Sequence, residues 1–313
     1  MQSPRPHVFF NSNLDSPEDW RHALAQHLED FAFTVGPQCA DPRSVDVALL
    51  YKLPERGLLE FRNLRAVISL SAGINQFEPT LMPPGVALSR SIDPTLTQHM
   101  VAYAKAAVYR HQRRFDEFER RARAAVWRFE APKPIGETTV GVLGLGELGG
   151  AIAASLVDDG FQVRGWSRSA KPSTQWRTHS GNDGLYAMVA ACDIIINVLP
   201  LTPATENILS AQLLAGFKPG ACLVNMGRGA HVVEDDLLAA IEQGVIAGAT
   251  LDVTRQEPLP EGHPFWGHPR ILVTPHIAGL TSPATAAAQV AENILRAMRG
   301  EALLNQVDFA KGY

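Results

Sequence analysis

Cysteine is scarce in this chain of 313 residues, which contains only three, Cys39, Cys192 and Cys222. An odd number of cysteines without a Cys-x-x-Cys pair favours neither a disulfide framework nor a zinc site. Cys192 and Cys222 lie in apolar runs, where a thiol is usually buried and inert. We therefore expect no metal site, and a reducing compartment such as the cytoplasm.

Long apolar runs and excess charge are missing as well. No run is long enough to span a membrane, and the formal net charge is only −4. The first residues lack the charged and then apolar pattern of a secretory signal. We expect a cytoplasmic protein that binds neither membranes nor nucleic acid. The length of 313 residues is enough for two domains with separate cores, and the hydrophobic content of 46% excludes a disordered protein.

The stretch 138–150 predicts a dinucleotide site. An apolar, β-branched run reads as a buried strand and is followed by Gly144-x-Gly146-x-x-Gly149 and an alanine-rich helical run. The first glycine suits a tight turn, the second admits a pyrophosphate, and the third lets helix and strand pack closely. A glycine-rich turn without a ligand is the alternative, but the flanking strand and helix favour the dinucleotide. The expected contacts are Gly144, Gly146, Glu147, Leu148 and Gly149.

The residues after the next strand indicate which dinucleotide is bound. Ser167 and Arg168 stand about 20 residues beyond the glycines, where an NAD site carries an acidic residue for the ribose 2′-hydroxyl. Arg168 and Lys171 instead offer positive charge to a 2′-phosphate. We therefore expect NADP(H) to be preferred, with NAD(H) possible. Solvated cations in a surface loop are the alternative.

Strand and helix patterns alternate along the whole chain. Strands are expected at 8–10, 45–51 and 66–70 before the glycine motif, and at 161–169, 193–199, 221–226, 245–253 and 271–276 after it. Such alternation predicts parallel, doubly wound α/β sheets. Residues 97–125 read as one long helix with arginines interleaved with acids, which favours a packing or dimerisation element over nucleic-acid binding.

Three polar residues lie at or just beyond expected strand ends, where α/β sheets bind ligands. Arg228 stands between two glycines, a flexible setting from which a guanidinium reaches a carboxylate. Glu257 lies in a proline-stiffened turn, and His276 follows Thr274-Pro275. Singly, they could be a surface arginine, a solvated glutamate and a structural histidine. Together on a dinucleotide domain, they suggest acid–base chemistry.

The motifs GLGELG, NMGRGAHVVEDDLLAAI, LDVTRQEPLP and FWGHPRILVTPHIAGLT resemble those of the D-isomer-specific 2-hydroxyacid dehydrogenases. The likeness extends through SAGIN, RRFDEF, GWSR and NQVDFAKGY to the bacterial glyoxylate/hydroxypyruvate reductase A group. It implies a Rossmann cofactor domain, 99–282, and a smaller flavodoxin-like substrate domain, 1–98 with 283–313, with a cleft between them. It also implies a homodimer.

The resemblance assigns roles to residues. It implies that Arg228, Glu257 and His276 are catalytic, and that Ala72, Gly73 and Ile74 hold the substrate carboxylate together with Arg228. Further cofactor contacts are expected at Leu199, Pro200, Thr205, Met226, Gly227, Asp252, Ala278 and Gly279. Where the family pattern leads us to expect a tryptophan before Pro54, this chain has Tyr51-Lys52. Trp266 could reach a pocket or serve only in packing.

The expected reaction is NADPH-dependent reduction of a small 2-oxoacid, glyoxylate or hydroxypyruvate, to the 2-hydroxyacid. His276 would donate a proton to the carbonyl oxygen, Glu257 would favour the protonated imidazole, and Arg228 would polarise the carbonyl. Bulkier 2-oxoacids such as phenylpyruvate share the same anchoring groups. A dinucleotide-sensing co-repressor built on this scaffold is the alternative outside the enzymes. Glu257 argues against a formate dehydrogenase, in which glutamine pairs with the histidine.

Overall fold

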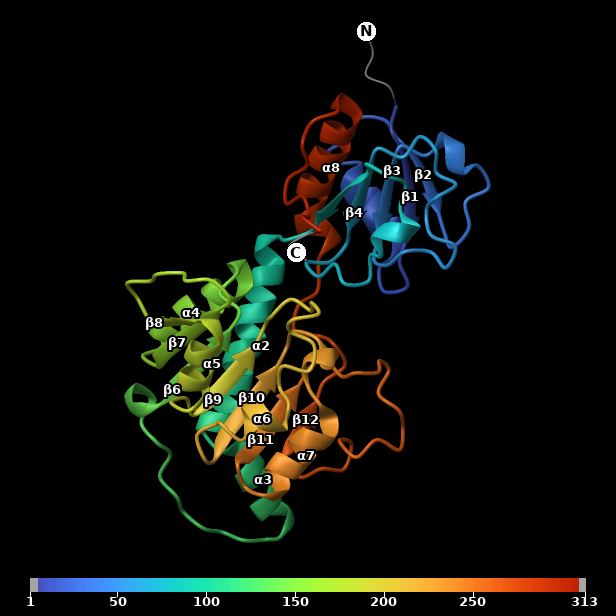
Figure 1. The fold of residues 1–313 in the computed structure, drawn as a ribbon. Helices are drawn as coiled ribbons and strands as arrows, with labels where there is room; N and C mark the ends of the chain where they lie inside the picture. Colours follow the sequence, from blue (N-terminus) through green and yellow to red (C-terminus); the bar gives the residue numbers. More distant parts are fainter. Residues whose placement is uncertain (1–4, 310–313) are drawn as a thin grey trace. The chain divides into compact units, whose positions relative to one another are not determined.

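The structure is a computed structural model that describes residues 5–309 (Figure 1). The chain forms two compact units, one running up to Leu96 and resuming at Leu280, the other comprising Thr97–Gly279. The division expected from the sequence, at 98/99 and 282/283, falls within helix α2 (Pro94–Gln112) and at the start of helix α8 (Pro283–Arg299).

The first unit is a five-stranded parallel sheet in the order β2-β1-β3-β4-β5, which is the flavodoxin-like order (Figure 1). Helices α1 (Pro17–Leu24) and α8 contribute to an apolar cluster on one face of the sheet. A second cluster packs the opposite face against the loops after β3 and β4. The strands are β1 (His7–Asn11), β2 (Ala32–Val35), β3 (Val47–Leu50), β4 (Ala66–Ser69) and β5 (Ala87–Arg90).

The second unit is a seven-stranded parallel sheet in the order β12-β11-β10-β9-β6-β7-β8. Strand order reverses beside β6, the switch point at which such sheets bind ligands. The strands are β6 (Thr139–Leu143), β7 (Gln162–Ser167), β8 (Arg177–Ser180), β9 (Ile194–Asn197), β10 (Ala221–Asn225), β11 (Ile246–Leu251) and β12 (Ile271–Val273). The helices besides α2 are α3 (Phe115–Arg123), α4 (Glu147–Asp158), α5 (Gly181–Val189), α6 (Ala211–Leu214) and α7 (Glu234–Glu242). The predicted doubly wound α/β fold is confirmed.

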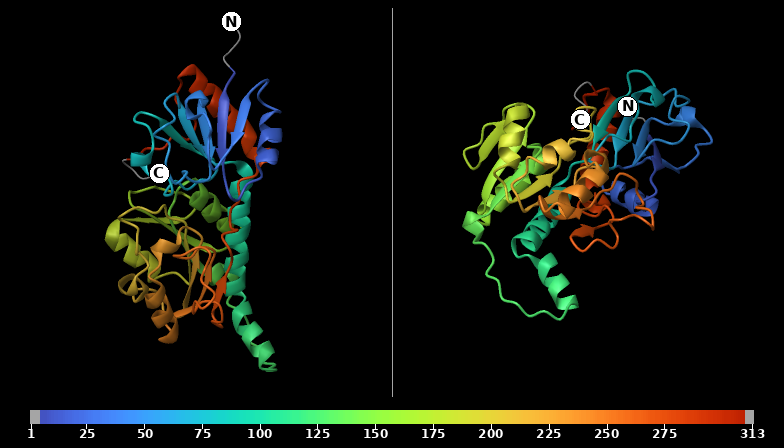
Figure 2. Two further views of the ribbon diagram at one scale, coloured as in Figure 1. Left: turned by 90° about the vertical axis from the view of Figure 1, so that its right-hand side faces the viewer. Right: turned by 60° about the horizontal axis from the view of Figure 1, so that its bottom comes forward.

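The long helix expected at 97–125 is wrong in one respect, because it is two helices. Arg114 has a left-handed backbone, with φ of 56°, which ends α2 and starts α3 in a new direction. Figure 2 shows α3 and the loop after it standing away from the sheet of this unit. The interleaved charges pair as expected, with Arg110 Nη1 2.6 Å from Glu119 Oε1. In residues 5–309, no helix combines the length and apolarity that a membrane span requires.

Candidate active site

The glycine loop after β6 has the geometry that its spacing predicts. Gly144 has φ of 103°, a conformation that side chains disfavour. A Cβ on Gly149 would lie 1.8 Å from the carbonyl oxygen of Gly144, so only glycine allows α4 to approach the strand this closely. A Cβ on Gly146 would meet nothing within 4 Å, which leaves open space beside the loop. Glu147 and Leu148 open α4, where backbone N–H groups favour a phosphate.

The loop after β7 lies beside the glycine loop because β6 and β7 are neighbours. The Lys171 ammonium donates to the carbonyl oxygen of Leu145 at 2.9 Å, which ties the two loops together. Ser167 is buried, and its hydroxyl donates to the carbonyl oxygen of Ser169 at 2.7 Å. The Arg168 side chain is exposed at this edge. The loop therefore presents two cations and no carboxylate close to the glycine loop.

A buried histidine that the sequence analysis did not single out organises the neighbouring loops. His231 is fully buried, and its Nδ1 accepts from the backbone N–H of Arg228 at 3.1 Å and from Asn197 Nδ2 at 2.9 Å. Its Nε2 lies 3.3 Å from the carbonyl oxygen of Pro200, to which it donates. Burial lowers the pKa of His231 to about 4, which keeps the ring neutral and Nδ1 an acceptor at neutral pH.

Two buried asparagines extend this network at the ends of β9 and β10. Asn197 Nδ2 donates to Asn225 Oδ1 at 2.9 Å, and Asn197 Oδ1 accepts from the N–H of Leu199. Asn225 accepts from the N–H of Gly227 and donates from Nδ2 to the carbonyl oxygen of Arg228. The asparagines fix the loops that begin at Leu199 and at Met226, which contain predicted cofactor contacts. Asparagine at the end of an apolar strand was the available sequence signal.

Other contacts hold the loop after β9. The hydroxyl of Thr205 donates to the carbonyl oxygen of Pro200 at 2.7 Å and accepts from the N–H of Thr202 at 2.8 Å. Thr205 therefore closes a compact turn beside the glycine loop, since β9 is the other neighbour of β6. Its place at this edge of the sheet agrees with a cofactor contact, which stays a prediction.

The backbone at Arg228 is held tightly, so its expected flexible setting is wrong. A Cβ on Gly229 would lie 1.9 Å from the carbonyl carbon of Thr254, which places these two backbones in direct contact. A Cβ on Gly227 would lie 3.1 Å from Asn197 Nδ2. The two glycines allow close packing, and Arg228 Nη1 donates to the carbonyl oxygen of Gly227 at 2.8 Å. The guanidinium therefore projects from a rigid base.

Glu257 and His276 form the predicted carboxylate–imidazole pair. His276 Nδ1 lies 2.8 Å from Glu257 Oε2, while the N–H of Thr254 donates to the other carboxylate oxygen at 3.2 Å. Burial raises the pKa of the Glu257 carboxyl, but the hydrogen bond from His276, its charge and the Thr254 N–H outweigh burial and leave that pKa lowered. Glu257 is therefore ionised, accepts from Nδ1–H, and leaves Nε2 for a ligand.

The loop that carries His276 is held by Asp252, at the end of β11. Its Oδ1 accepts from Thr274 Oγ1 at 2.7 Å and from the N–H of Ile277 at 2.8 Å, and its Oδ2 accepts from the N–H of Ala278 at 2.8 Å. His276 has φ of 55°, and its N–H donates to the carbonyl oxygen of Asp252 at 2.8 Å. This strained position is fixed by the surrounding hydrogen bonds. Gly279 continues the loop.

Tyr103 on α2 adds to this support, a role that the sequence did not suggest. Its hydroxyl lies 2.6 Å from Thr274 Oγ1, which itself donates to Asp252, so the tyrosine hydroxyl is the donor. Burial raises the pKa of Tyr103 to about 12, so its proton stays in place across the physiological range.

The predicted carboxylate-binding loop lies in the first unit, directly after β4. Ala72, Gly73 and Ile74 donate no backbone N–H hydrogen bond to any residue from 5 to 309. Successive backbone N–H groups without partners can donate to an anion such as a carboxylate. A carboxylate site at this loop agrees with these N–H groups and stays a prediction.

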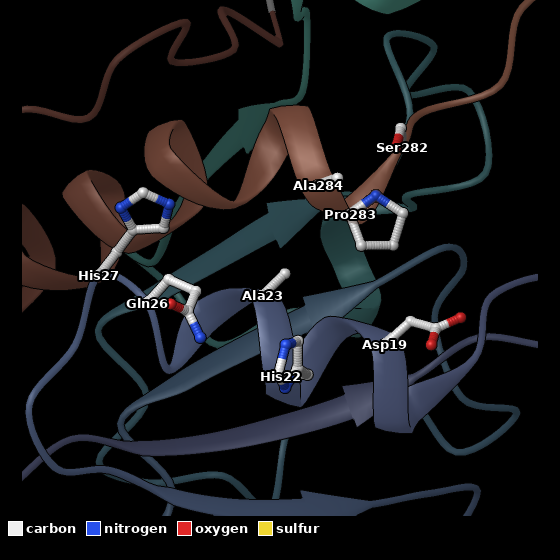
Figure 3. A pocket seen from close by; sticks show the side chains of 8 residues that line it. All are labelled: Asp19, His22, Ala23, Gln26, His27, Ser282, Pro283 and Ala284. Carbon is white, nitrogen blue, oxygen red and sulfur yellow. The ribbon is translucent and has the colours of Figure 1, made fainter.

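Trp266 and a pocket in the first unit are not part of the predicted site. Trp266 is 53% exposed, and its Nε1 donates to the carbonyl oxygen of Pro260 at 2.9 Å, so it closes its own surface turn. A pocket in the first unit lies between α1 and the start of α8 (Figure 3). His22, His27 and Ser282 line it, none of them a predicted site residue. Across residues 5–309, no group of three metal-ligating side chains is close enough to hold an ion.

Comparison with known proteins identifies the family of this chain. Residues 106–278 match the family model of the D-isomer specific 2-hydroxyacid dehydrogenase NAD-binding domain. The chain is 42% identical over 313 residues to the glyoxylate/hydroxypyruvate reductase A of Serratia proteamaculans, covering 98% of each protein.

Solved structures give the same result. A D-isomer specific 2-hydroxyacid dehydrogenase from Xanthobacter autotrophicus, in complex with NADPH and MES, is 39% identical with a TM-score of 0.93, covering 99% of this chain and 100% of that one. An NADPH-dependent glyoxylate/hydroxypyruvate reductase from Sinorhizobium meliloti, in complex with NADP and sulfate, is 32% identical with a TM-score of 0.90, with the same coverage. The chain belongs to the D-isomer specific 2-hydroxyacid dehydrogenase family.

Proposed function

We propose that this dehydrogenase reduces small 2-oxoacids, glyoxylate and hydroxypyruvate among them, with NADPH as the hydride donor. The observation that carries the proposal is the 2.8 Å bond between His276 Nδ1 and Glu257 Oε2. The pair stands in the same unit as the glycine loop and follows the carboxyl ends of the parallel strands. The names of the Serratia and Sinorhizobium relatives support the substrate class.

The residues divide the chemistry between them. NADPH, when bound, supplies a hydride to the 2-oxo carbon. Glu257 holds Nδ1–H of His276, so protonated His276 donates from Nε2 to the carbonyl oxygen as negative charge develops there. Arg228 binds the carboxylate and polarises the carbonyl, a contribution that grows toward the transition state. The N–H groups of Ala72, Gly73 and Ile74 bind the substrate carboxylate. Hydride and proton together convert the carbonyl into a hydroxyl.

The test is the fall in reduced-nicotinamide absorbance with glyoxylate, hydroxypyruvate and phenylpyruvate. We expect rapid turnover of the two small acids, and a fall in kcat of about a hundredfold or more for His276→Asn. Asparagine tolerates the left-handed backbone, so the variant removes the proton donor without altering the loop. If phenylpyruvate were the best substrate, the small-acid assignment would be wrong. If no acid were reduced despite tight binding of NADPH, a cofactor-sensing role would replace the enzyme.

The preference for NADPH rests on Arg168 and Lys171. Lys171 is bonded to the glycine loop, Arg168 lies in the same loop after β7, and this loop contains no carboxylate to repel a 2′-phosphate. The NADPH-bound Xanthobacter structure supports the same cofactor. We expect Arg168→Asp to lower the NADPH-to-NADH ratio of kcat/KM at least tenfold, while the exposed Arg62→Asp in the other unit leaves it unchanged. An unchanged ratio in the Arg168 variant would contradict the assignment.

We also propose that two copies associate through the arm formed by α3 and the loop to residue 134. Trp127 is fully exposed, Phe129 is 87% exposed, and Phe115 and Val126 are each half exposed. Such a concentration of exposed aromatics marks an interface. Sedimentation should show a dimer that Trp127→Ser with Phe129→Ser converts to monomer, while Trp266→Ser stays dimeric. A monomeric wild-type protein would refute the association.

A further inference from the structure

Gln76 makes an unusual set of contacts in the first unit. Its side-chain Nε2 lies 2.9 Å from the carbonyl oxygen of Tyr51, 2.9 Å from Ser71 Oγ and 3.1 Å from the carbonyl oxygen of Gly73. An amide nitrogen has two hydrogens, so these three acceptors share both of them. The side chain is partly buried and lies just after the carboxylate-binding loop at 72–74.

The contacts of Gln76 join two loops that follow neighbouring strands. Tyr51 follows β3, Ser71 follows β4, and these strands pair in parallel with Leu50 opposite Ser69. Gln76 thus fastens the loop at Ser71–Gly73 to the backbone of Tyr51. The loop has a second internal brace, because Ser71 Oγ donates to the carbonyl oxygen of Gly73 at 2.8 Å.

Holding the carbonyl of Gly73 also orients the adjacent N–H group. In a planar trans peptide, the C=O of one residue and the N–H of the next point in opposite directions. The Gly73 carbonyl faces Gln76 and Ser71, so the N–H of Ile74 faces away from them. That N–H has no partner among residues 5–309, which leaves it available to a ligand.

We propose that Gln76 is a positioning residue that sets the substrate-carboxylate affinity of the 72–74 loop; this inference rests on the function proposed above. Its amide fixes the peptide between Gly73 and Ile74 and holds the loop against Tyr51. Gln76 acts through the loop backbone and makes no contact with the reacting carbon. Its loss therefore weakens substrate binding and leaves cofactor binding unchanged.

The test compares Gln76→Met with the wild-type enzyme. Methionine has a similar length and no donors, so the carbonyl oxygens of Tyr51 and Gly73 lose the amide. We expect KM for glyoxylate to rise about tenfold, the size of one net hydrogen bond, while kcat falls less than KM rises. The inhibition constant of oxalate should rise by the same factor, and KM for NADPH should stay unchanged. Gln26→Met, an exposed change on the surface of the same unit, serves as the matched control.

The outcomes separate this inference from the proposed function. An active wild-type enzyme with unchanged KM and oxalate inhibition in Gln76→Met would refute the role of Gln76 alone. A lower melting temperature with unchanged KM would show that Gln76 serves stability only, and would also refute it. A wild-type protein that reduces no 2-oxoacid would refute the proposed function first. Isothermal titration of the NADP-bound protein with oxalate would then still test whether Gln76 governs carboxylate binding.

Discussion

Low pH should destabilise the second unit, Thr97–Gly279, because His231 becomes protonated. Its Nδ1 must stay unprotonated to accept from Arg228 and Asn197, and burial holds its pKa at about 4, against 6.5 in a free chain. Between these values the unfolded state binds a proton that the folded state does not. The stabilising contribution is therefore complete above about pH 6.5 and is lost as the pH falls toward about 4.

The size of this effect follows from the two pKa values. At about 1.4 kcal/mol per pH unit, the full interval corresponds to about 3 kcal/mol. Between about pH 7.5 and about pH 5, the loss should be about 2 kcal/mol. His111 is also buried, with a pKa lowered to about 4 by burial, but it contributes equally to wild type and to a His231 variant. Its contribution therefore cancels in their comparison.

The assay is urea unfolding of wild type and His231→Gln at both pH values. Glutamine does not titrate. From about pH 7.5 to about pH 5, the free energy of unfolding of His231→Gln should therefore fall by about 2 kcal/mol less than that of the wild type. The comparison uses the pH-dependent difference alone, so any general loss of stability in the variant does not affect it. His22→Gln on the exposed surface of α1 is the control. Equal losses in wild type and His231→Gln would refute the reasoning.

Three substitutions test the packing around the site. Gly149→Ala would place a Cβ 1.8 Å from the carbonyl oxygen of Gly144, so we expect the affinity for NADPH, measured by fluorescence titration, to fall at least tenfold. A Cβ on Gly150 would meet nothing within 4 Å, so Gly150→Ala should bind NADPH normally. Gly229→Ala should cost at least about 2 kcal/mol of unfolding free energy, because its Cβ meets backbone at 1.9 Å; a loss below about 0.5 kcal/mol would contradict this contact. Tyr103→Phe removes the hydrogen bond to Thr274 and should cost about 1 kcal/mol in the same assay, and no change would show that the bond contributes nothing.

The local features of the fold could be predicted from the sequence. The glycine spacing placed β6, the turn and α4, because each glycine meets a requirement within a few residues of itself. The fold class followed from the alternation of strand and helix patterns, and the family followed from local motifs such as GLGELG. Strands β2, β5 and β8 were not predicted, since they are short and lie at sheet edges or among polar residues.

The supporting contacts could not be predicted, because they join residues far apart in the chain. Asn197 and His231 are separated by 34 positions, and no sequence pattern near either residue predicts their hydrogen bond. Tyr103 and Thr274 are 171 positions apart. The prediction of one helix over 97–125 failed for another reason: no glycine or proline lies near Arg114, and its left-handed φ separates α2 from α3. The distance between the Glu257 carboxylate and the His276 ring could be obtained only from the three-dimensional structure.

The divided first unit has a consequence for biosynthesis. Its core combines residues of β1, β3 and β4 with Ala286, Val290 and Ile294 of α8. The ribosome makes α8 only after the whole of Thr97–Gly279, so the second unit has all of its residues before the first unit has its final helix. The nascent first unit exposes the apolar face that α8 later covers, and is vulnerable to aggregation or chaperone capture during that interval. Synthesis thus completes the second unit first, and the first unit, whose sheet lies at the start of the chain, last.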